Sequence, residues 1–332
     1  MFPKPFLLLL LLSLIQGQVA RGKSVLDEPW TDAYSSHPAP VASPTPTPAG
    51  KSPEEQTIAD ANMVLEFSPR DIESYIKRAN AYTKLGKFDK AEADFQKGLK
   101  INPADAYLLN SYGLFLARQK KLDDALANFN KSIAAKPDYA AARYNRGLVY
   151  ASLNRDDDAI ADYSAALALD PKDGDSYFNR AMAYRRQKAE DKALADLEQA
   201  VKLNPEDADA LYQRGLALIA VGRFQEAVNS FTKSLDLVPR NPDTLYNRGI
   251  ARGRLGQLDG AIADYDQAIE IRPNDPDAYF NRANAKRLKG LKNSAVEDYQ
   301  QFMVLAPAGY EKFVEQAKKR IEELQRPTIR LR

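Results

Sequence analysis

Few residues of this chain have side chains suited to catalysis or metal binding. The sequence contains no Cys and a single His, His37. These counts exclude disulfides, thiolate metal sites, Cys nucleophiles, His-pair metal sites and ordinary Ser-His-Asp triads. We therefore expect no catalytic residue, no metal ligand and no enzyme activity in the chain itself.

One segment matches a nucleotide-binding motif, but its surroundings argue against that function. Residues Gly17 to Ser24 read Gly-Gln-Val-Ala-Arg-Gly-Lys-Ser and fit the P-loop pattern G-x-x-x-x-G-K-S. A P-loop needs a helix directly after its Lys, because the helix N-terminus holds the phosphate. Here Pro29 and a tract rich in Pro, Ser and Thr follow instead. We interpret the match as accidental and expect no cofactor and no small-molecule substrate.

The charge balance excludes a further class of partner. The chain has 47 basic and 45 acidic residues, so its net charge is +2. Nonspecific binding to nucleic acid needs a strong basic field, which this chain lacks. The length of 332 residues allows two or three domains or one extended array, and the apolar fraction of 44% is enough for a large core.

Residues 1–20 have the pattern of a secretory signal peptide. Lys4 precedes the apolar run Phe6–Ile15, which would cover about half of a ~30 Å hydrocarbon core. Cleavage after Gly17 or after Ala20 would fit, and the alternatives are an uncleaved anchor or a wrongly assigned start. We expect a periplasmic protein, with the extracellular space or the endoplasmic reticulum as alternatives. No later segment is apolar enough to span a membrane.

Residues 21–54 are predicted to be a disordered linker. Such a tract cannot bury enough apolar surface to fold. Its single His37 is then simply solvated. The linker prolines alternate with Ser, Thr and Ala, and they are Pro38, Pro40, Pro44, Pro46, Pro48 and Pro53.

The rest of the chain repeats one motif with a period of 34 residues. This period is typical of stacked helix pairs. We number the positions of each repeat from 1 at Ile72, so that position 32 is the repeated proline. The prolines in phase are Pro69, Pro103, Pro137, Pro171, Pro205, Pro239, Pro273 and Pro307.

Three further positions keep their character in all seven repeats. Position 20 is always Ala, position 8 is always Gly or Ala, and position 24 is Phe, Tyr or, once, Leu197. Small residues let two helices approach closely, and a bulky residue fills the space beside them. Asp105, Asp173, Asp207 and Asp275 at position 34 are predicted to cap the next first helix.

This pattern resembles the tetratricopeptide repeat (TPR) family, which has the same small residue, alanine, aromatic residue and proline. The resemblance covers residues 72–309 without a gap. It implies an all-α fold, a right-handed α-solenoid of seven helix pairs whose first helices line a concave groove.

The ends of the array are predicted to carry capping helices, because terminal repeats expose an apolar face. Residues 55–71 hold an N-terminal helix over Glu54–Phe67, with an apolar side that includes Phe67. Residues 310–325 hold a C-terminal amphipathic helix, on which Phe302 is expected to pack, and residues 326–332 form a basic tail. The apolar residues of the two caps are Ile58, Ala61, Leu65 and Phe67, and Tyr310, Phe313, Ala317, Ile321 and Leu324.

Two positions covary among the repeats of this one chain. Position 7 is Arg in six repeats, and position 23 is Asp in five, each of which also carries the Arg. A partly buried charge needs a paired neighbour, so we interpret these residues as an ion pair between the two helices of one repeat. A row of cationic ligand contacts is the alternative. The paired residues are Arg78 and Asp94, Arg146 and Asp162, Arg180 and Asp196, Arg248 and Asp264, and Arg282 and Asp298.

The resemblance implies that positions 2, 5, 6, 9, 12 and 13 face the groove. Carboxamides at position 6 can donate to and accept from a peptide backbone, and aromatic rings at position 5 offer contact area. The alternative is that both residues only follow the common repeat pattern. The candidate groove residues are Asn145, Asn179, Gln213, Asn247 and Asn281 at position 6, and Tyr144, Phe178, Tyr212, Tyr246 and Phe280 at position 5.

A more specific family function is not expected. TPRs that bind the C-terminal carboxylate of chaperones have Lys at position 5, whereas this chain has Ile76, Asn110 or an aromatic residue there. The sequence therefore predicts a non-catalytic scaffold that binds an extended or helical protein segment in its groove. The alternative is an accessory subunit that localises or activates an enzyme of the cell envelope. Self-association into a homo-oligomer stays open.

Overall fold

The computed structural model describes residues 50–326, which are helical and contain no strand. The predicted signal peptide, most of the predicted linker and most of the basic tail lie outside the described residues. None of the described helices is long and apolar enough to cross a membrane. The chain divides into two compact units between Lys172 and Asp173, and we describe each unit by itself.

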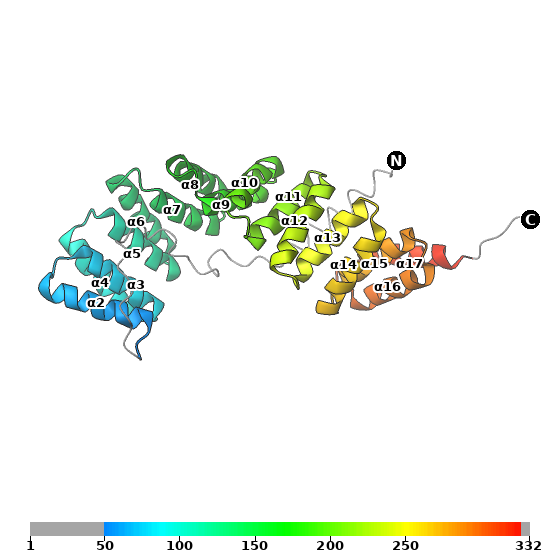
Figure 1. The fold of residues 1–332 in the computed structure, drawn as a ribbon, viewed down its shortest axis with the longest axis horizontal. Coiled ribbons are helices and arrows are strands. Elements are labelled where there is room, and N and C mark those ends of the chain that lie inside the picture. The colour runs from blue at the N-terminus through cyan, green and yellow to red at the C-terminus, as the bar shows by residue number, and fades with distance from the viewer. Residues whose placement is uncertain (1–49, 327–332) are drawn as a thin grey trace, which may run out of the picture. The chain divides into compact units, whose positions relative to one another are not determined.

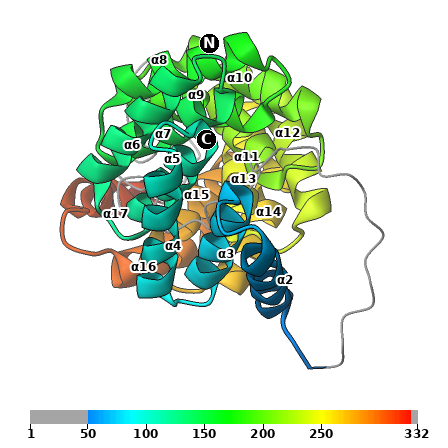
Figure 2. The same cartoon turned by 90° about the vertical axis from the view of Figure 1, so that its left-hand side faces the viewer.

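Unit 1 holds the N-terminal capping helix and three helix pairs (Figure 1). Each helix packs against the next one along the chain, as Figure 2 shows for α2, α3 and α4. The helices are α2 (Pro53–Phe67), α3 (Ile72–Lys84), α4 (Phe88–Ile101), α5 (Ala106–Arg118), α6 (Leu122–Ala135), α7 (Ala140–Ser152) and α8 (Asp156–Leu169).

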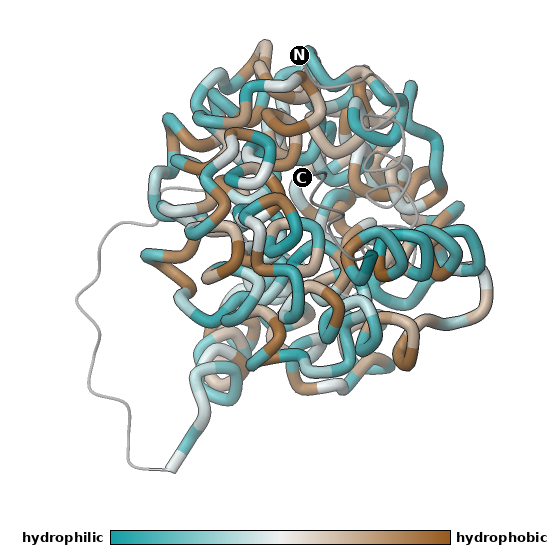
Figure 3. Tube along the Cα trace, turned by 90° about the vertical axis from the view of Figure 1, so that its right-hand side faces the viewer, coloured by the Kyte–Doolittle hydropathy of each residue, from teal (hydrophilic) through white to brown (hydrophobic). Residues whose placement is uncertain are grey.

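Unit 2 holds four helix pairs and the C-terminal capping helix. Hydrophilic and hydrophobic residues alternate along its helices, as expected when one side of each helix is covered (Figure 3). The helices are α9 (Gly174–Arg186), α10 (Glu190–Leu203), α11 (Ala208–Ala220), α12 (Phe224–Leu237), α13 (Pro242–Arg254), α14 (Leu258–Ile271), α15 (Pro276–Leu288), α16 (Lys292–Leu305) and α17 (Glu311–Gln325).

The starts of the first helices follow the sequence prediction. Asp105, Asp173, Asp207 and Asp275 are N-caps, and each accepts a hydrogen bond from a backbone N–H of the first turn. These bonds satisfy donors that a helix end leaves without a partner. Asn241 caps α13 in the same way, whereas Tyr139 before α7 makes no side-chain cap bond.

The core lies between the two helices of each repeat. The Ala residues at position 20 and the large residues at position 24 are fully buried, for example Ala261 and Tyr265. A Cβ atom added to Gly249 at position 8 would lie 2.7 Å from the Tyr265 ring. Glycine here allows the first helix to approach the ring closely.

The turn between the two helices requires a left-handed residue at position 15 in every repeat. Glycine adopts this conformation without strain, whereas other residues rarely do. Three consecutive repeats nevertheless use Lys or Asn there. The residues are Gly86, Gly222, Gly256 and Gly290, with φ of 69–86°, and Lys120, Asn154 and Lys188, with φ of 57–60°.

The two capping helices differ in how well they are covered. At the C-terminus, Ala317 of α17 is buried and joins Phe302 and Tyr299 in one cluster, against which Phe313 packs. At the N-terminus, Ala61 and Leu65 of α2 are buried. Phe67 is 81% exposed, so its assignment to the apolar side of α2 was wrong. Among the described residues α2 has no first helix of its own, and Phe67 at its end stays uncovered although Leu65 is buried.

Candidate functional site

The Arg residues at position 7 form ion pairs with the Asp residues at position 23 of the same repeat. In repeat 3, Arg146 Nε lies 2.7 Å from one Asp162 oxygen, and Nη2 lies 2.6 Å from the other. The same two-point contact occurs in the other four repeats that have both residues. We call these five pairs the Arg–Asp seam. They are the pairs that the covariation predicts, and they join the two helices of a repeat.

The seam is buried and electrostatically favourable. The five Asp residues are 1–6% exposed. The hydrogen bond to Asp raises the pKa of Arg78, Arg146 and Arg180, although burial acts in the opposite direction. Two-point contacts between guanidinium and carboxylate are strong because both groups are charged and their shapes match. The geometry therefore gives these Arg residues a structural role.

The same Arg residues also reach the preceding repeat, which the sequence analysis missed. Arg146 Nη1 donates to Asn130 Oδ1 at 2.5 Å, and Arg282 Nη1 donates to Asp266 Oδ1 at 2.6 Å. Arg78 and Arg248 contact Asn62 and Thr232 in the same way. All acceptors lie at position 25 or its equivalent in α2. A signal was present, because position 25 is polar in every repeat.

Repeat 5 departs from the seam. Position 23 is Ser230, and Arg214 Nη1 donates to its hydroxyl at 3.3 Å. Glu198 of the preceding repeat lies 4.0 Å from Arg214 Nη2. The Arg214 Nε atom is buried without a hydrogen-bond partner among the described residues. This repeat therefore holds its Arg less completely than the others.

The aromatic residues at position 5 pack on the core as well as lying on the first helices. Tyr144, Tyr212, Tyr246 and Phe280 each place their ring 5.9 Å from the position 24 ring of the same repeat. Phe280 also contacts Phe302 and Phe313 of the C-terminal cap. Phe280 is therefore part of the capping cluster.

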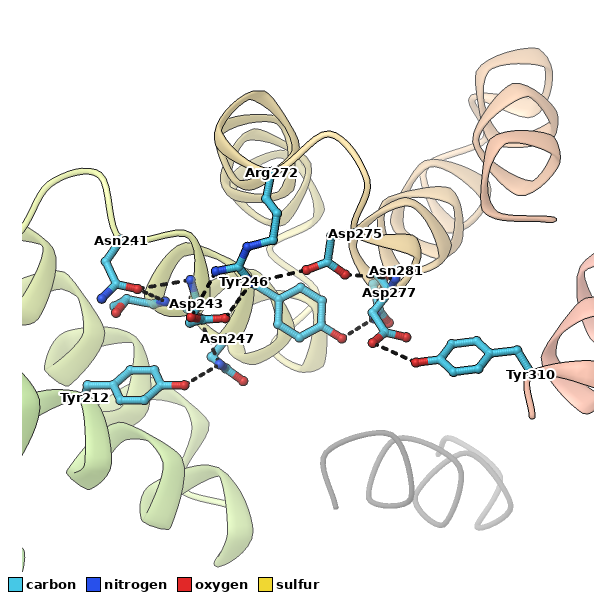
Figure 4. Close-up of polar contacts among 11 residues, drawn as sticks. Tyr212, Asn241, Asp243, Tyr246, Asn247, Arg272, Asp275, Asp277, Asn281 and Tyr310 are labelled. Atoms are coloured by element: carbon cyan, nitrogen blue, oxygen red, sulfur yellow. Dashed lines mark hydrogen bonds and ion pairs between the residues drawn. The ribbon is translucent and has the colours of Figure 1, made fainter. Parts of the chain in front are cut away.

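The carboxamides at position 6 of α13 and α15 bond to the protein itself (Figure 4). Asn247 Nδ2 donates to the Tyr212 hydroxyl at 3.2 Å and to the Asp243 carbonyl at 2.8 Å. Asn281 Nδ2 makes the equivalent bonds to the Tyr246 hydroxyl at 2.9 Å and the Asp277 carbonyl at 3.0 Å. The expectation that these amides both donate to and accept from a peptide therefore needs correction. Their N–H groups already link consecutive first helices.

The other amides at position 6 are also held by neighbours. Asn179 Nδ2 donates to the Asp175 carbonyl at 2.9 Å, and Gln213 accepts a hydrogen bond from Arg185. In unit 1, Asn145 is buried and donates to Asn110 Oδ1 at 2.9 Å.

Position 2 forms an acidic row on the first helices of unit 2. The row consists of Asp175, Asp209, Asp243 and Asp277. Asp243 is paired with Arg272 at 2.9 and 3.1 Å, and Asp277 accepts a hydrogen bond from Tyr310 at 3.2 Å. Positions 2, 5 and 6 of α9, α11, α13 and α15 together are called the first-helix face of unit 2 below.

Unit 1 has different side chains at this place, namely Tyr107 at position 2 of α5, with Lys136 and Tyr139 in the turn between α6 and α7. Tyr107 and Tyr139 lie with ring centroids 4.9 Å apart, and Lys136 Nζ lies 4.7 Å from the Tyr107 ring. Asn110 Nδ2 donates to the Tyr139 hydroxyl at 3.4 Å. Burial raises the pKa of Tyr139. These side chains contact one another where unit 2 has its acidic row.

The family of the chain follows from these repeats and from comparison with known proteins. Models described as tetratricopeptide repeats match residues 72–105, 121–174, 174–207 and 208–241, and one described as a TPR repeat matches residues 254–290. Together they cover more than half of the chain. The chain belongs to the tetratricopeptide repeat family.

Individual TPR proteins are similar over different lengths. The STIP1 homolog of Dictyostelium discoideum is 37% identical over 54 residues, which are 16% of this chain and 10% of that protein. The chain thus spans about a tenth of this curated relative. The crystal structure of YrrB, described as a TPR protein with an unusual peptide-binding site, is 27% identical, with a TM-score of 0.53. The match covers 55% of this chain and 95% of the YrrB chain.

Two further solved structures support the fold alone. The C-terminal part of a TPR repeat-containing protein from Cytophaga hutchinsonii is 18% identical, with a TM-score of 0.59, and covers 74% of this chain and 99% of its own. PilF of Pseudomonas aeruginosa is 17% identical, with a TM-score of 0.57, and covers 64% of this chain and 97% of its own.

Within residues 50–326, no group of three or more His, Asp or Glu side chains is arranged to hold a metal ion. The buried carboxylates of the Arg–Asp seam are held by guanidinium groups. What the described repeats offer chemically is a patterned surface.

Proposed function

We propose that the chain is a non-catalytic scaffold that binds a segment of a partner protein on the first-helix face of unit 2. The observation that carries this proposal is the regular row of polar side chains on four successive first helices. Its amides are held in place by hydrogen bonds between repeats, such as that from Asn281 to Tyr246. Preorganised side chains reduce the entropy cost of binding.

Two further observations support the same proposal. TPR proteins bind protein partners, and YrrB is described as having a peptide-binding site. The equal spacing of the first helices also suits an extended or helical segment, because such a segment is itself a regular repeat.

A capture experiment tests the proposal. The triple variant Asn179→Ala, Gln213→Ala and Asn281→Ala changes the first-helix face of unit 2. The matched control Asn229→Ala, Gln267→Ala and Gln300→Ala changes three exposed amides of second helices. Both variants and the wild type are checked for helicity and crosslinked in native extract.

We expect the wild type and the control to capture the same partner protein, and the triple variant to fail to capture it. Equal capture by all three proteins contradicts the proposed site. Capture of an enzyme whose activity depends on this chain favours the accessory-subunit alternative over a passive scaffold.

We also propose that the chain enters the secretory pathway through the apolar run Phe6–Ile15. N-terminal sequencing of the protein from its native source tests this. A mature N-terminus just after Gly17 or Ala20 supports export, whereas an intact Met1 on a cytoplasmic protein contradicts it.

A further inference from the structure

The first-helix face of unit 2 has spare hydrogen-bond acceptors. The Nδ2 atoms of Asn247 and Asn281 each donate two hydrogen bonds within the protein. Asn247 is 6% exposed, and its Oδ1 atom is buried without a partner among the described residues. In Figure 4 this oxygen points away from the Tyr212 hydroxyl. A buried acceptor without a partner costs free energy, which a donor from a ligand would recover.

This face also carries negative charge, which favours the same donor-rich, cationic ligands as its spare acceptors do. The side chains of Asp175 and Asp209 are exposed and form no ion pair or hydrogen bond with any described residue. Nearby, Asp173 and Asp207 are N-caps and accept backbone N–H groups. Partial desolvation by neighbouring groups and the charges of Asp173 and Asp207 raise the pKa of Asp175. The N-terminal end of this face thus has negative charge that no neighbouring cation neutralises.

Several cations on the same helices are bound to other groups. Arg252 pairs with Asp264, Lys286 pairs with Asp298, and Arg185 lies 3.5 Å from Glu190. Arg254 stacks on the Phe224 ring, and burial lowers its pKa.

Arg180, Arg214, Arg248 and Arg282 at position 7 contact position 23 of the second helices. The other Arg residues of these helices lie far from the acidic row. Arg186 and Arg287 are ten or more residues after position 2, which is about 15 Å along a helix. A ligand helix is about 10–12 Å wide, so a segment over positions 2–6 lies against acceptors and carboxylates.

We propose that the first-helix face of unit 2 selects a basic protein segment. Lys or Arg side chains of the segment pair with Asp175 and Asp209, and a backbone N–H donates to Asn247 Oδ1. The inference rests on the proposed function and adds the chemical class of the partner. It follows from charge and hydrogen-bond complementarity, because a donor-rich cationic segment matches the exposed carboxylates of Asp175 and Asp209 and the acceptor of Asn247.

Selection from a random 12-residue peptide library on the immobilised full chain tests this inference. The test variant Asp175→Asn and Asp209→Asn removes two charges from the face. The matched control Asp191→Asn and Asp236→Asn removes two exposed charges from the second helices α10 and α12. Affinities of the selected peptides are measured by fluorescence anisotropy at low and high salt.

We expect enrichment of Lys and Arg and depletion of Asp and Glu. The test variant should bind the selected peptides about five- to tenfold more weakly, whereas the control binds like the wild type. Binding should weaken with salt, because exposed charges are screened.

The outcomes separate the two proposals. Enriched peptides without excess basic residues, bound through the amides of the first-helix face, overturn the charge inference and leave the proposed function standing. Basic peptides that bind the test variant as well as the wild type also overturn the inference. Absence of any enriched peptide contradicts both proposals.

Discussion

The Arg–Asp seam and the first-helix face respond differently to sequence change along the array. The seam has the same two-point geometry in unit 1, at Arg146–Asp162, and in unit 2, at Arg282–Asp298. The face changes from Tyr107 and Lys136 in unit 1 to the acidic row in unit 2. The comparison teaches that the seam is a constant structural contact of the repeats that carry it, whereas the proposed binding face varies along the array.

The largest expected effect comes from breaking the seam where it is most connected. Asp264 is 1% exposed and pairs with both Arg248 and Arg252 at 2.7 Å. Asp264→Ala leaves two partly buried cations without their partner, so we expect a loss of about 3 kcal/mol in the free energy of unfolding. Urea unfolding measures it, with Asp236→Ala as the exposed control. If Asp264→Ala lowers the free energy of unfolding no more than Asp236→Ala does, the seam does not stabilise the repeat.

The comparison can be sharpened in repeat 5, which lacks the seam carboxylate. Ser230→Asp would give Arg214 the partner that Arg has in five other repeats, and we expect a gain of about 1 kcal/mol. Ser230→Asn has nearly the same size without the charge and is the matched control. Thermal unfolding decides, and equal stability of the two variants would mean that the charge of the seam contributes nothing.

A smaller loss is expected on the face itself. Asn281→Ala removes the hydrogen bond to the Tyr246 hydroxyl, which should lower the free energy of unfolding by about 0.5–1 kcal/mol. A double-mutant cycle with Tyr246→Phe isolates this bond. If the two losses simply add, the bond between repeats does not stabilise the array.

The smallest effect concerns the pH dependence of Asp175. Its raised pKa means that the folded state binds the proton more tightly than the unfolded state, so ionisation disfavours folding as pH rises. The position in the first turn of α9 acts in the opposite direction, because the helix dipole favours a negative charge. As the pH rises from roughly 3 to 7, we expect the free energy of unfolding of Asp175→Asn to increase relative to that of the wild type by less than about 0.5 kcal/mol. Urea unfolding of both proteins at the two pH values tests this. A variant that becomes less stable relative to the wild type as the pH rises contradicts it.

The fold could be predicted from sequence because each repeat carries the same local signals. Pro at position 32 and Ala at position 20 in every repeat, and an Asp N-cap at position 34 in four of them, act within a few residues of themselves. The seam was also predictable, because Ser230 and Asn128 stand where the other repeats have Asp. Seven aligned copies in one chain make such a comparison possible.

The chemistry of the face was less predictable, because it depends on distances between neighbouring first helices. Sequence identified Asn247 and Asn281, but their N–H groups are already used by Tyr212 and Tyr246 of the preceding repeats. Phe67 shows the same limit at the end of the array. Its spacing from the other apolar residues of α2 predicted a buried side chain, but no described helix covers it.

The hydrogen bonds within a repeat and those between repeats connect residues close in sequence. The seam joins residues 16 apart, the Asn–Tyr bonds join residues 35 apart, and the bond from Arg320 to Asn284 spans 36. Chains with such local contacts close only short loops while folding and tend to fold fast. During synthesis, a repeat can form its contacts as soon as the next first helix has left the ribosome. Unfolding can likewise begin at one end of a unit and proceed one repeat at a time.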